Sequence, residues 1–325
     1  MKIAVLGAGA MGAMIGAYLK KGGAQVFFVD PYEAHMQAVS EHGLYMEIEG
    51  CDPETVYMDG ATTNAEEVGV CDVVILLVKG MKTVSSIESN KALFGRDTVI
   101  ITLQNGLGNV DLIKEFFPDD NIGYGILKSS ATLYAPGKIY GRSIFEGSPA
   151  GVFFYPVTKD TPYFQYYSDL VDIFVAGGFI PKLEEQIDEI IWDKLYSNVA
   201  FNCPCALIQI SHCDFIYHPM GKIIFREICD EVCAIATAKG IPMDADYYWE
   251  HHGEPLIPTG PVTERYYTSA VHDVSRKHKT EVDFLNGAIY YEGQKLGIPT
   301  PYNEMIWRLT RILEDTYDVK YTPET

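Results

Sequence analysis

The start of the chain carries two short apolar runs separated by a glycine-rich stretch. Residues 2–6 and 25–30 are rich in strand-forming Val, Ile and Phe. Residues 13–21 between them have the composition of a helix, and the glycines at 22–23 predict its end. The pattern therefore predicts a strand, a helix and a second strand in succession.

Two later runs, 72–78 and 98–103, are apolar at most positions. Strands of this kind are buried on both faces, as in a parallel sheet that is covered by helices. The stretch 121–157 is richer in Gly, Tyr and Phe, with turn residues between short runs. We expect added antiparallel strands there.

Near residue 185 the character of the chain changes, and helical periodicity dominates beyond it. Gly-Ile-Pro at 240–242 and again at 297–299 predicts two helix ends. Residues 251–263 contain several prolines and are expected to form a loop. The predicted helices are residues 188–202, 217–239, 270–296 and 302–316.

Together these elements predict an α/β fold with two domains. Residues 1–185 are expected to form a Rossmann-type, doubly wound dinucleotide-binding domain, and residues 186–325 an all-helical domain for substrate and dimerisation. With 325 residues, 47% of them hydrophobic, the chain can bury two cores. The apolar faces of the C-terminal helices, with their many Tyr and Phe, favour a homodimer.

The formal net charge is −19, from 25 Lys and Arg against 44 Asp and Glu. This balance argues against nucleic acid or an anionic membrane surface as a partner, because both require clustered cations. It leaves a small anionic substrate open, since one local cation can bind it. The apolar run from Ile3 to Leu19 is interrupted by glycines and is too short for a spanning helix, so no membrane segment is expected.

The seven cysteines favour reduced thiols in a cytoplasmic protein, because their number is odd and their spacing irregular. The Cys and His residues between 203 and 213 match no common zinc spacing, and neither do the adjacent His251 and His252. We therefore expect no metal site.

The glycine stretch has the spacing of a dinucleotide-binding turn, Gly7-x-Gly9-x-x-Gly12, with Ala10 and Met11 inside it. Gly7 permits the tight turn, Gly9 lets a pyrophosphate approach the backbone, and Gly12 lets the helix pack close to the sheet. The following helix N-terminus offers N–H groups to the phosphates. A glycine turn without a ligand is the alternative, but the strand before and the helix after it favour the dinucleotide.

Asp30, at the end of the second strand, is placed to bind the adenosine ribose. Its carboxylate accepts hydrogen bonds from ribose hydroxyls and repels a 2′-phosphate, which favours NAD over NADP. Lys79 and Lys82 follow the next predicted strand and keep NADP open, because either can reach a phosphate.

Three polar residues, Lys194, Asn198 and Asn202, recur every four positions and share one helix face. Ile191, Leu195 and Val199 form the apolar stripe beside them. Such a line can present a proton donor and two carboxamides to a small keto acid. From the spacing alone, the alternative interpretation is a solvent-exposed helix face with incidental polar residues.

Several motifs, in order along nearly the whole chain, resemble the ketopantoate reductase family. They are GAGAMG at 7–12, Lys79 in VKGMKT, Asn105 in LQNGLGN, KLYSNVAFN at 194–202 and the segment 268–287. The resemblance implies a Rossmann domain, a helical domain and NADPH-dependent reduction of 2-dehydropantoate to D-pantoate in pantothenate biosynthesis.

By this resemblance, Lys194 is the general acid and Glu281 the active-site glutamate. Asn198, Asn202 and Ser269 match substrate-contacting positions, and Asn105 matches the asparagine near the nicotinamide and substrate. Lys79, Asn105 and Glu281 are also expected to contact the cofactor. Without the resemblance, Glu281 reads as a surface charge and Ser269 as a helix N-cap.

Two features depart from the family pattern. Asp30 and Pro31 stand where members that use NADPH tend to carry a basic residue, and the 251–263 segment is longer than a minimal member needs. Both suit an NAD-dependent D-2-hydroxyacid dehydrogenase that acts on branched or aromatic 2-keto acids, such as a D-mandelate-like substrate. A non-catalytic dinucleotide sensor is the alternative from another functional class.

Overall fold

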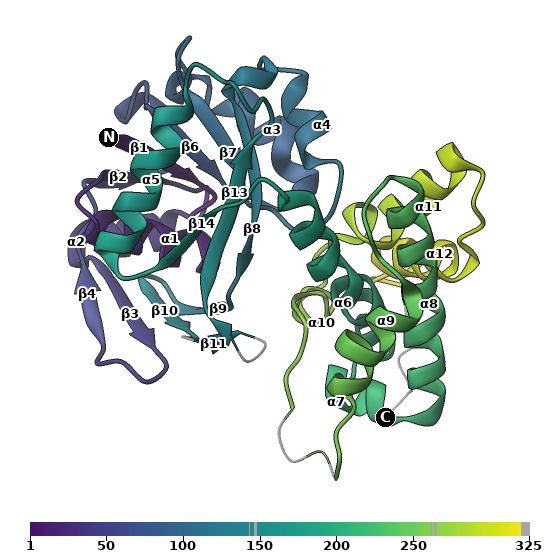
Figure 1. Cartoon of the computed structure of the whole chain (residues 1–325). Coiled ribbons are helices and arrows are strands. Elements are labelled where there is room, and N and C mark those ends of the chain that lie inside the picture. Colours follow the sequence, from purple (N-terminus) through teal and green to yellow (C-terminus); the bar gives the residue numbers. More distant parts are fainter. Residues whose placement is uncertain (143, 146–147, 261, 263–264, 320–325) are drawn as a thin grey trace, which may run out of the picture. The chain divides into compact units, whose positions relative to one another are not determined.

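The computed structural model describes residues 1–142, 144–145, 148–260, 262 and 265–319. The chain forms two compact units (Figure 1). The first comprises residues 1–104 and 109–187, and the second comprises 105–108 and 188–325. The sequence placed a single boundary at 185. It gave no sign that the loop 105–108 belongs to the second unit.

The first unit is built on an eight-stranded sheet with the order β14-β13-β8-β7-β6-β1-β2-β5. Neighbouring strands are parallel except at one junction, where β13 runs antiparallel to β8. This is the expected Rossmann-type, doubly wound arrangement. The strands are β1 (Lys2–Leu6), β2 (Gln25–Val29), β5 (Gly60–Thr62), β6 (Val73–Leu76), β7 (Val99–Thr102), β8 (Ile122–Lys128), β13 (Gly151–Pro156) and β14 (Ile180–Leu183).

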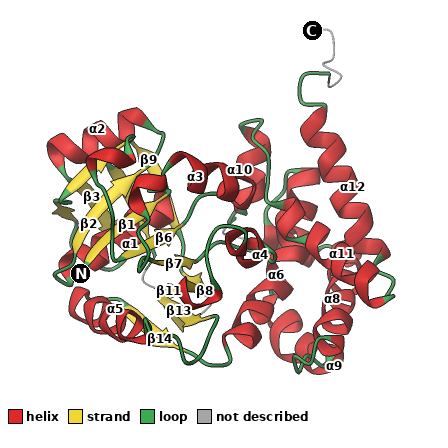
Figure 2. Ribbon diagram, turned by 90° about the horizontal axis from the view of Figure 1, so that it is seen from above, coloured by secondary structure: helices red, strands yellow, loops and turns green. Residues whose placement is uncertain are grey.

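Helices cover both faces of this sheet, which is why its central strands are apolar at every position (Figures 1 and 2). On one face, α1 (Ala10–Lys21) and α5 (Phe164–Gly177) share a core with the strands. On the other face, α3 (Thr83–Ser89) and α4 (Asn109–Lys114) contribute Ile87 and Ile113 to a second core.

A smaller sheet, β4-β3-β10-β9, packs on α1 within the same unit. Its strands are β3 (Leu44–Ile48), β4 (Glu54–Val56), β9 (Ala131–Ala135) and β10 (Lys138–Gly141); β11 (Ile144–Phe145) pairs with β12 (Ser148–Pro149), and α2 (Glu33–His42) precedes β3. The expectation of antiparallel strands in 121–157 is confirmed, because β8 pairs antiparallel with β13 and β9 with β10. On its other side β8 runs parallel to β7, because α4 returns the chain across the sheet.

Of the helices that the structure describes, none is both long and apolar enough to cross a membrane.

Every described element of the second unit is helical. The helices are α6 (Ile187–Ile208), α7 (His212–Tyr217), α8 (Pro219–Ala238), α9 (Ala245–Tyr248), α10 (Ser269–Ser275), α11 (Asn286–Leu296) and α12 (Pro301–Asp315). Short 3-10 or π turns, labelled η, are η1 (Ala65–Glu67), η2 (Gly80–Lys82), η3 (Lys91–Leu93), η4 (Asp119–Asn121), η5 (Trp249–Gly253), η6 (Glu254–Leu256) and η7 (Val282–Phe284).

Three predicted elements of this unit differ from the structure. The helix expected at 270–296 is broken between α10 and α11, where Lys277 adopts a positive φ of 58°. The helix expected to end at 202 continues to Ile208 despite Pro204, because the residues around that proline are fully buried in the core. The loop expected at 251–263 begins as the π and 3-10 turns η5 and η6.

A buried histidine ties three parts of the first unit together. The backbone N–H of Gly137, in the turn between β9 and β10, donates to Nδ1 of His35 at 2.8 Å. Nδ1 is therefore the acceptor, so Nε2 carries the hydrogen and donates to the carbonyl of Ala8 at 2.9 Å. Burial lowers the pKa of His35, although the Ala8 carbonyl and the Asp30 carboxylate oppose that shift. The ring is neutral, and its two hydrogen bonds connect α2 to the turn after β1 and to the small sheet.

We predict that this histidine makes the fold less stable in mild acid. The unfolded chain takes up a proton at His35 near pH 6.5, whereas the folded chain does so only at lower pH. The free energy of unfolding therefore falls as the pH drops below about 6.5, by up to about 1.4 kcal/mol per pH unit. Urea denaturation at about pH 7.5 and about pH 5.5 measures this change. The free energy of unfolding should fall less between the two pH values for His35→Gln than for wild type.

His42→Gln is the matched control, because His42 lies on the same helix and is exposed. Burial also lowers the pKa of His212, but wild type and both variants share that contribution. An equal loss of stability in wild type and His35→Gln contradicts the prediction.

Candidate active site

The carboxyl ends of the central strands of the first unit meet at one edge of the sheet. Leu6 pairs with both Val29 and Leu76, and Leu76 pairs with Thr102. The residues that follow these strands therefore emerge side by side. In an open α/β sheet this is the edge where ligands bind.

The glycine turn at this edge fits a dinucleotide. Gly7 has a φ of 96°, and a Cβ on Gly12 would overlap the Gly7 carbonyl, so both positions require glycine. A Cβ on Gly9, in contrast, would meet nothing within 4 Å. The Gly9 backbone thus faces open space, into which a pyrophosphate fits.

The start of α1 completes this cradle. Ala10 and Met11 are its first residues; none of the described side chains caps it, and its first turn holds no acid. The first N–H groups of the helix are therefore suited to bind phosphate oxygens.

Asp30 and Lys79 follow the two neighbours of β1 at the same edge. One oxygen of Asp30, Oδ1, accepts the backbone N–H of Tyr32 at 2.8 Å, which fixes the carboxylate. Lys79 is half-buried and stands immediately before η2. Lys82 ends that turn and is exposed.

Gln104 is a structural residue of this edge that sequence reasoning missed. Its Nε2 donates to the Val78 carbonyl at 2.7 Å and lies 2.9 Å from Thr83 Oγ1. The loop that carries Lys79 is therefore tied to the end of β7. The sequence signal that could have identified Gln104 is the polar pair Thr102 and Gln104 at the end of an apolar strand.

In the second unit, Lys194 contacts Asn105. Nζ of Lys194 donates to Oδ1 of Asn105 at 3.0 Å. The two residues are 89 positions apart, and α6 presents the lysine while the loop 105–108 presents the amide. Leu195 and Val199 of the predicted apolar stripe are buried in the core of this unit, as expected.

The loop 105–108 is held by backbone contacts with η7. The N–H of Leu107 donates to the Phe284 carbonyl at 2.8 Å. Gly106 has a φ of 82°, and a Cβ there would overlap the same carbonyl oxygen. Only glycine permits this approach. Glu281 immediately precedes η7, so one short segment both carries Glu281 and orients Asn105.

The remaining candidates lie along α6 and at the start of α10. Asn198 is half-buried and Asn202 is 9% exposed. Thr268, rather than Ser269, is the N-cap of α10, because its Oγ1 accepts the N–H of Val271 at 3.4 Å. The same hydroxyl donates to the Asn202 carbonyl at 3.3 Å. Ser269 is thus the first, exposed residue of a helix that is tied to α6 beside Asn202.

The segment after α9 packs on another side of α6. Nδ1 of His252 lies 3.3 Å from Oδ1 of Asp193, and the ring of Tyr248 packs against Tyr196. Asp193 is about 100° around the helix from Lys194. His252 of Trp249–Gly253 therefore contacts the flank of α6.

Among the residues that the structure describes, no group of three or more His, Cys, Asp or Glu side chains could hold a metal. Burial raises the pKa of Cys205 and of Cys233 to about 12, so both remain protonated thiols and poor ligands.

Comparisons with known proteins identify the same family in both halves of the chain. Residues 3–146 match the family model "Ketopantoate reductase PanE/ApbA", and residues 186–314 match the model of its C-terminal part. A 2-dehydropantoate 2-reductase of Streptococcus pyogenes is 27% identical over 98% of this chain and 100% of its own length. One of Pyrococcus abyssi is 28% identical over 96% of this chain and 97% of its own.

Solved structures give the same family. D-mandelate dehydrogenase with NADH and anilino(oxo)acetate superposes with a TM-score of 0.85 at 26% identity, over 98% of this chain and 100% of that one. A ketopantoate reductase of Ralstonia eutropha gives 0.81 at 27% identity, over 97% and 99%. The family and the NADH in two structures of D-mandelate dehydrogenase support a nicotinamide cofactor. The two family models together span most of the chain, and the protein belongs to the ketopantoate reductase family of oxidoreductases.

Proposed function

We propose that this protein reduces a 2-keto acid to a D-2-hydroxy acid, with 2-dehydropantoate as the substrate and D-pantoate as the product, in pantothenate biosynthesis. The observation that carries the proposal is the contact between Lys194 and Asn105, beside the segment that holds Glu281. A sensor that only binds a dinucleotide has no need of a lysine held in this way.

The chain's own residues supply the proton and hold the charges. A nicotinamide held by the glycine turn would supply the hydride, and negative charge would build on the carbonyl oxygen of the substrate. The ammonium group of Lys194 stabilises that charge and gives the oxygen its proton. Asn105 accepts one N–H of the ammonium and thereby orients it. Glu281 is proposed as the carboxylate that acts together with this ammonium group.

Asn198, Asn202 and Ser269 are proposed to bind the substrate. Carboxamide and hydroxyl groups donate hydrogen bonds to a carboxylate and accept them from substrate hydroxyls. Asn198 and Asn202 follow Lys194 along one face of α6, and the Thr268 bond keeps Ser269 beside that helix. This gives a polar row on one face of α6.

A second candidate is an NAD-dependent D-2-hydroxyacid dehydrogenase that acts on branched or aromatic keto acids. It is favoured by the carboxylate at residue 30, and D-mandelate dehydrogenase shares the scaffold of this chain. The chemistry at Lys194 is the same in both cases, and only the substrate side chain differs.

Initial rates with a panel of keto acids test the proposal. We expect turnover of 2-dehydropantoate, and compare it with phenylglyoxylate and 2-ketoisocaproate as aromatic and branched substrates. Lys194→Ala should lower kcat by about 100-fold or more, because a general acid contributes that much, while the Kd for NADH stays unchanged.

Lys295→Ala is the matched control, since Lys295 is an exposed lysine of the same unit. Turnover of phenylglyoxylate alone moves the assignment to the second candidate. NADH binding without turnover of any keto acid identifies a sensor and ends the proposal.

We also propose that the cofactor is NAD rather than NADP. Oδ1 of Asp30 is fixed by the Tyr32 N–H, so the carboxylate is held in place to bind ribose hydroxyls and to repel a 2′-phosphate. Asp30→Ser should lower kcat/KM for NADH and raise it for NADPH, changing their ratio by about 10-fold or more, the effect of about 1.4 kcal/mol. Glu33→Gln, an exposed acid in the first turn of α2, is the control. A wild-type preference for NADPH refutes the assignment.

The protein is further proposed to be a homodimer. Tyr302, Met305, Leu309 and Ile312 are exposed and recur along one side of α12. A stripe of exposed apolar residues is typical of a surface that a second copy covers. Light scattering after gel filtration should give twice the chain mass for wild type and the chain mass for Leu309→Glu. Glu304→Gln on the same helix should leave the mass unchanged, and a wild-type monomer disproves the proposal.

A further inference from the structure

A buried carboxylate of α12 holds the backbone just before Glu281. Oε1 of Glu314 accepts both the N–H and the hydroxyl of Thr280, each at 2.7 Å. Thr280 is 2% exposed and Glu314 is 6% exposed. Hydrogen bonds to an ionised group are stronger than neutral ones and are strongest away from water. The two residues are 34 positions apart, so this contact fixes the loop between α10 and α11 against α12.

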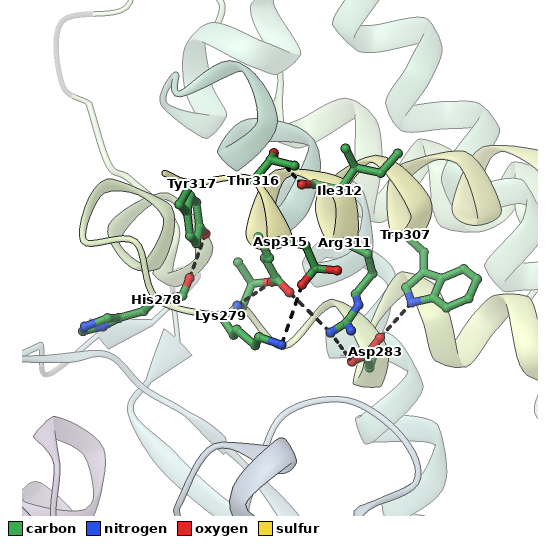
Figure 3. Close-up of polar contacts among 11 residues, drawn as sticks. His278, Lys279, Asp283, Trp307, Arg311, Ile312, Asp315, Thr316 and Tyr317 are labelled. Atoms are coloured by element: carbon green, nitrogen blue, oxygen red, sulfur yellow. Dashed lines mark hydrogen bonds and ion pairs between the residues drawn. The ribbon is translucent and has the colours of Figure 1, made fainter. Parts of the chain in front are cut away.

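The same helix also holds the other side of Glu281. Figure 3 shows Trp307 and Arg311 of α12 extending toward Asp283. Nε1 of Trp307 donates to Oδ1 of Asp283 at 2.8 Å, and Nη1 of Arg311 lies 3.4 Å from Oδ2. Arg311 also lies 3.6 Å from Oε2 of Glu314. Glu281 is therefore placed between two anchors, both of them on α12.

Hydrogen bonds, joined by short stretches of backbone, lead from Thr280 to the proposed proton donor. Thr280 Oγ1 accepts the N–H of Val282 at 3.2 Å, and the Glu281 carbonyl accepts the N–H of Phe284 at 3.0 Å. The Phe284 carbonyl then accepts the N–H of Leu107. Through Leu107, this series positions the loop whose Asn105 contacts Lys194.

Folding alone does not account for a carboxylate at this position. Removing a carboxylate from water is costly, and apolar residues of similar size often pack equally well. What the carboxylate adds is direction, because it sets the position of one backbone N–H and one hydroxyl at once. The neighbouring Cys203 on α6 interacts with Thr280 as well, and burial raises the pKa of its thiol, so it stays neutral beside Glu314.

We propose that Glu314 is a positioning residue for the reductase reaction: by holding Thr280, it fixes both Glu281 and the loop that presents Asn105 to Lys194. The effect on turnover rests on the function proposed above. The physical coupling between α12 and Leu107 does not, and it is measured separately.

The test alters the contact from both ends. Glu314→Gln keeps the shape of the side chain but replaces a charged acceptor with a neutral one. Thr280→Val removes the hydroxyl, and Thr280→Ser restores it. For each variant we measure kcat, KM for the keto acid, the Kd for NADH and thermal unfolding. Amide exchange, followed by mass spectrometry, is measured on a peptide that contains Leu107.

The proposal predicts that Glu314→Gln and Thr280→Val lower kcat by about 10-fold or more, since small displacements of reacting groups have effects of this size or larger. Exchange at Leu107 should rise in both variants, while NADH still binds, because the glycine turn that is expected to hold its pyrophosphate belongs to the first unit. Thr280→Ser should behave as wild type. Glu304→Gln, at a half-buried acid of α12 that pairs with Arg308, is the control.

Unchanged kcat and unchanged Leu107 exchange in folded Glu314→Gln and Thr280→Val overturn the proposal, even if their unfolding temperatures fall. Loss of folding in both variants overturns it too, because Glu314 is then required for the fold itself. If wild type reduces no keto acid, the proposed function fails, and the exchange at Leu107 still decides whether Glu314 controls the loop.

Discussion

The close approach of Gly106 to the Phe284 carbonyl is the contact on which the candidate site depends. A side chain at residue 106 cannot fit there, and the Leu107 N–H completes the attachment. This contact makes the loop 105–108 part of the second unit, although the residues on both sides of it in the chain belong to the first. Asn105 therefore reaches Lys194 through a backbone contact made at its neighbours rather than through its own side chain alone.

The two units provide different kinds of binding chemistry. At the sheet edge of the first unit, the groups available to a ligand are mainly backbone N–H groups of the glycine turn. The buried, neutral His35 holds that turn through the Ala8 carbonyl. In the second unit the chemistry resides in side chains, and short segments fix these by hydrogen bonds to main-chain atoms. Both arrangements limit motion of the groups that would meet a ligand, which is the physical basis of preorganisation.

Much of the first unit and the line of polar residues on α6 could be predicted from the sequence. Glycine spacing and apolar periodicity are local signals, and they identified β1, α1 and β2 as well as the buried side of α6. The pairing of β10 with β3 and the break between α10 and α11 could not be predicted, because both depend on partners far away in the chain. Glu314 is the clearest example of a residue whose role could not be predicted from the sequence. Three positions after Arg311, it has the spacing of a surface ion pair, and only the fold shows that it is buried against Thr280.

The discontinuity of the second unit also constrains how such a chain can evolve. A genetic crossover between two relatives near residue 187 would exchange α6 and the Glu281 segment together but would leave the loop 105–108 behind. The hybrid would then combine Asn105 and Gly106 from one parent with Lys194 and Phe284 from the other. Lineages that exchange these halves must keep the loop and the residues that it contacts compatible, although residues 109–187 of the first unit lie between them in the gene.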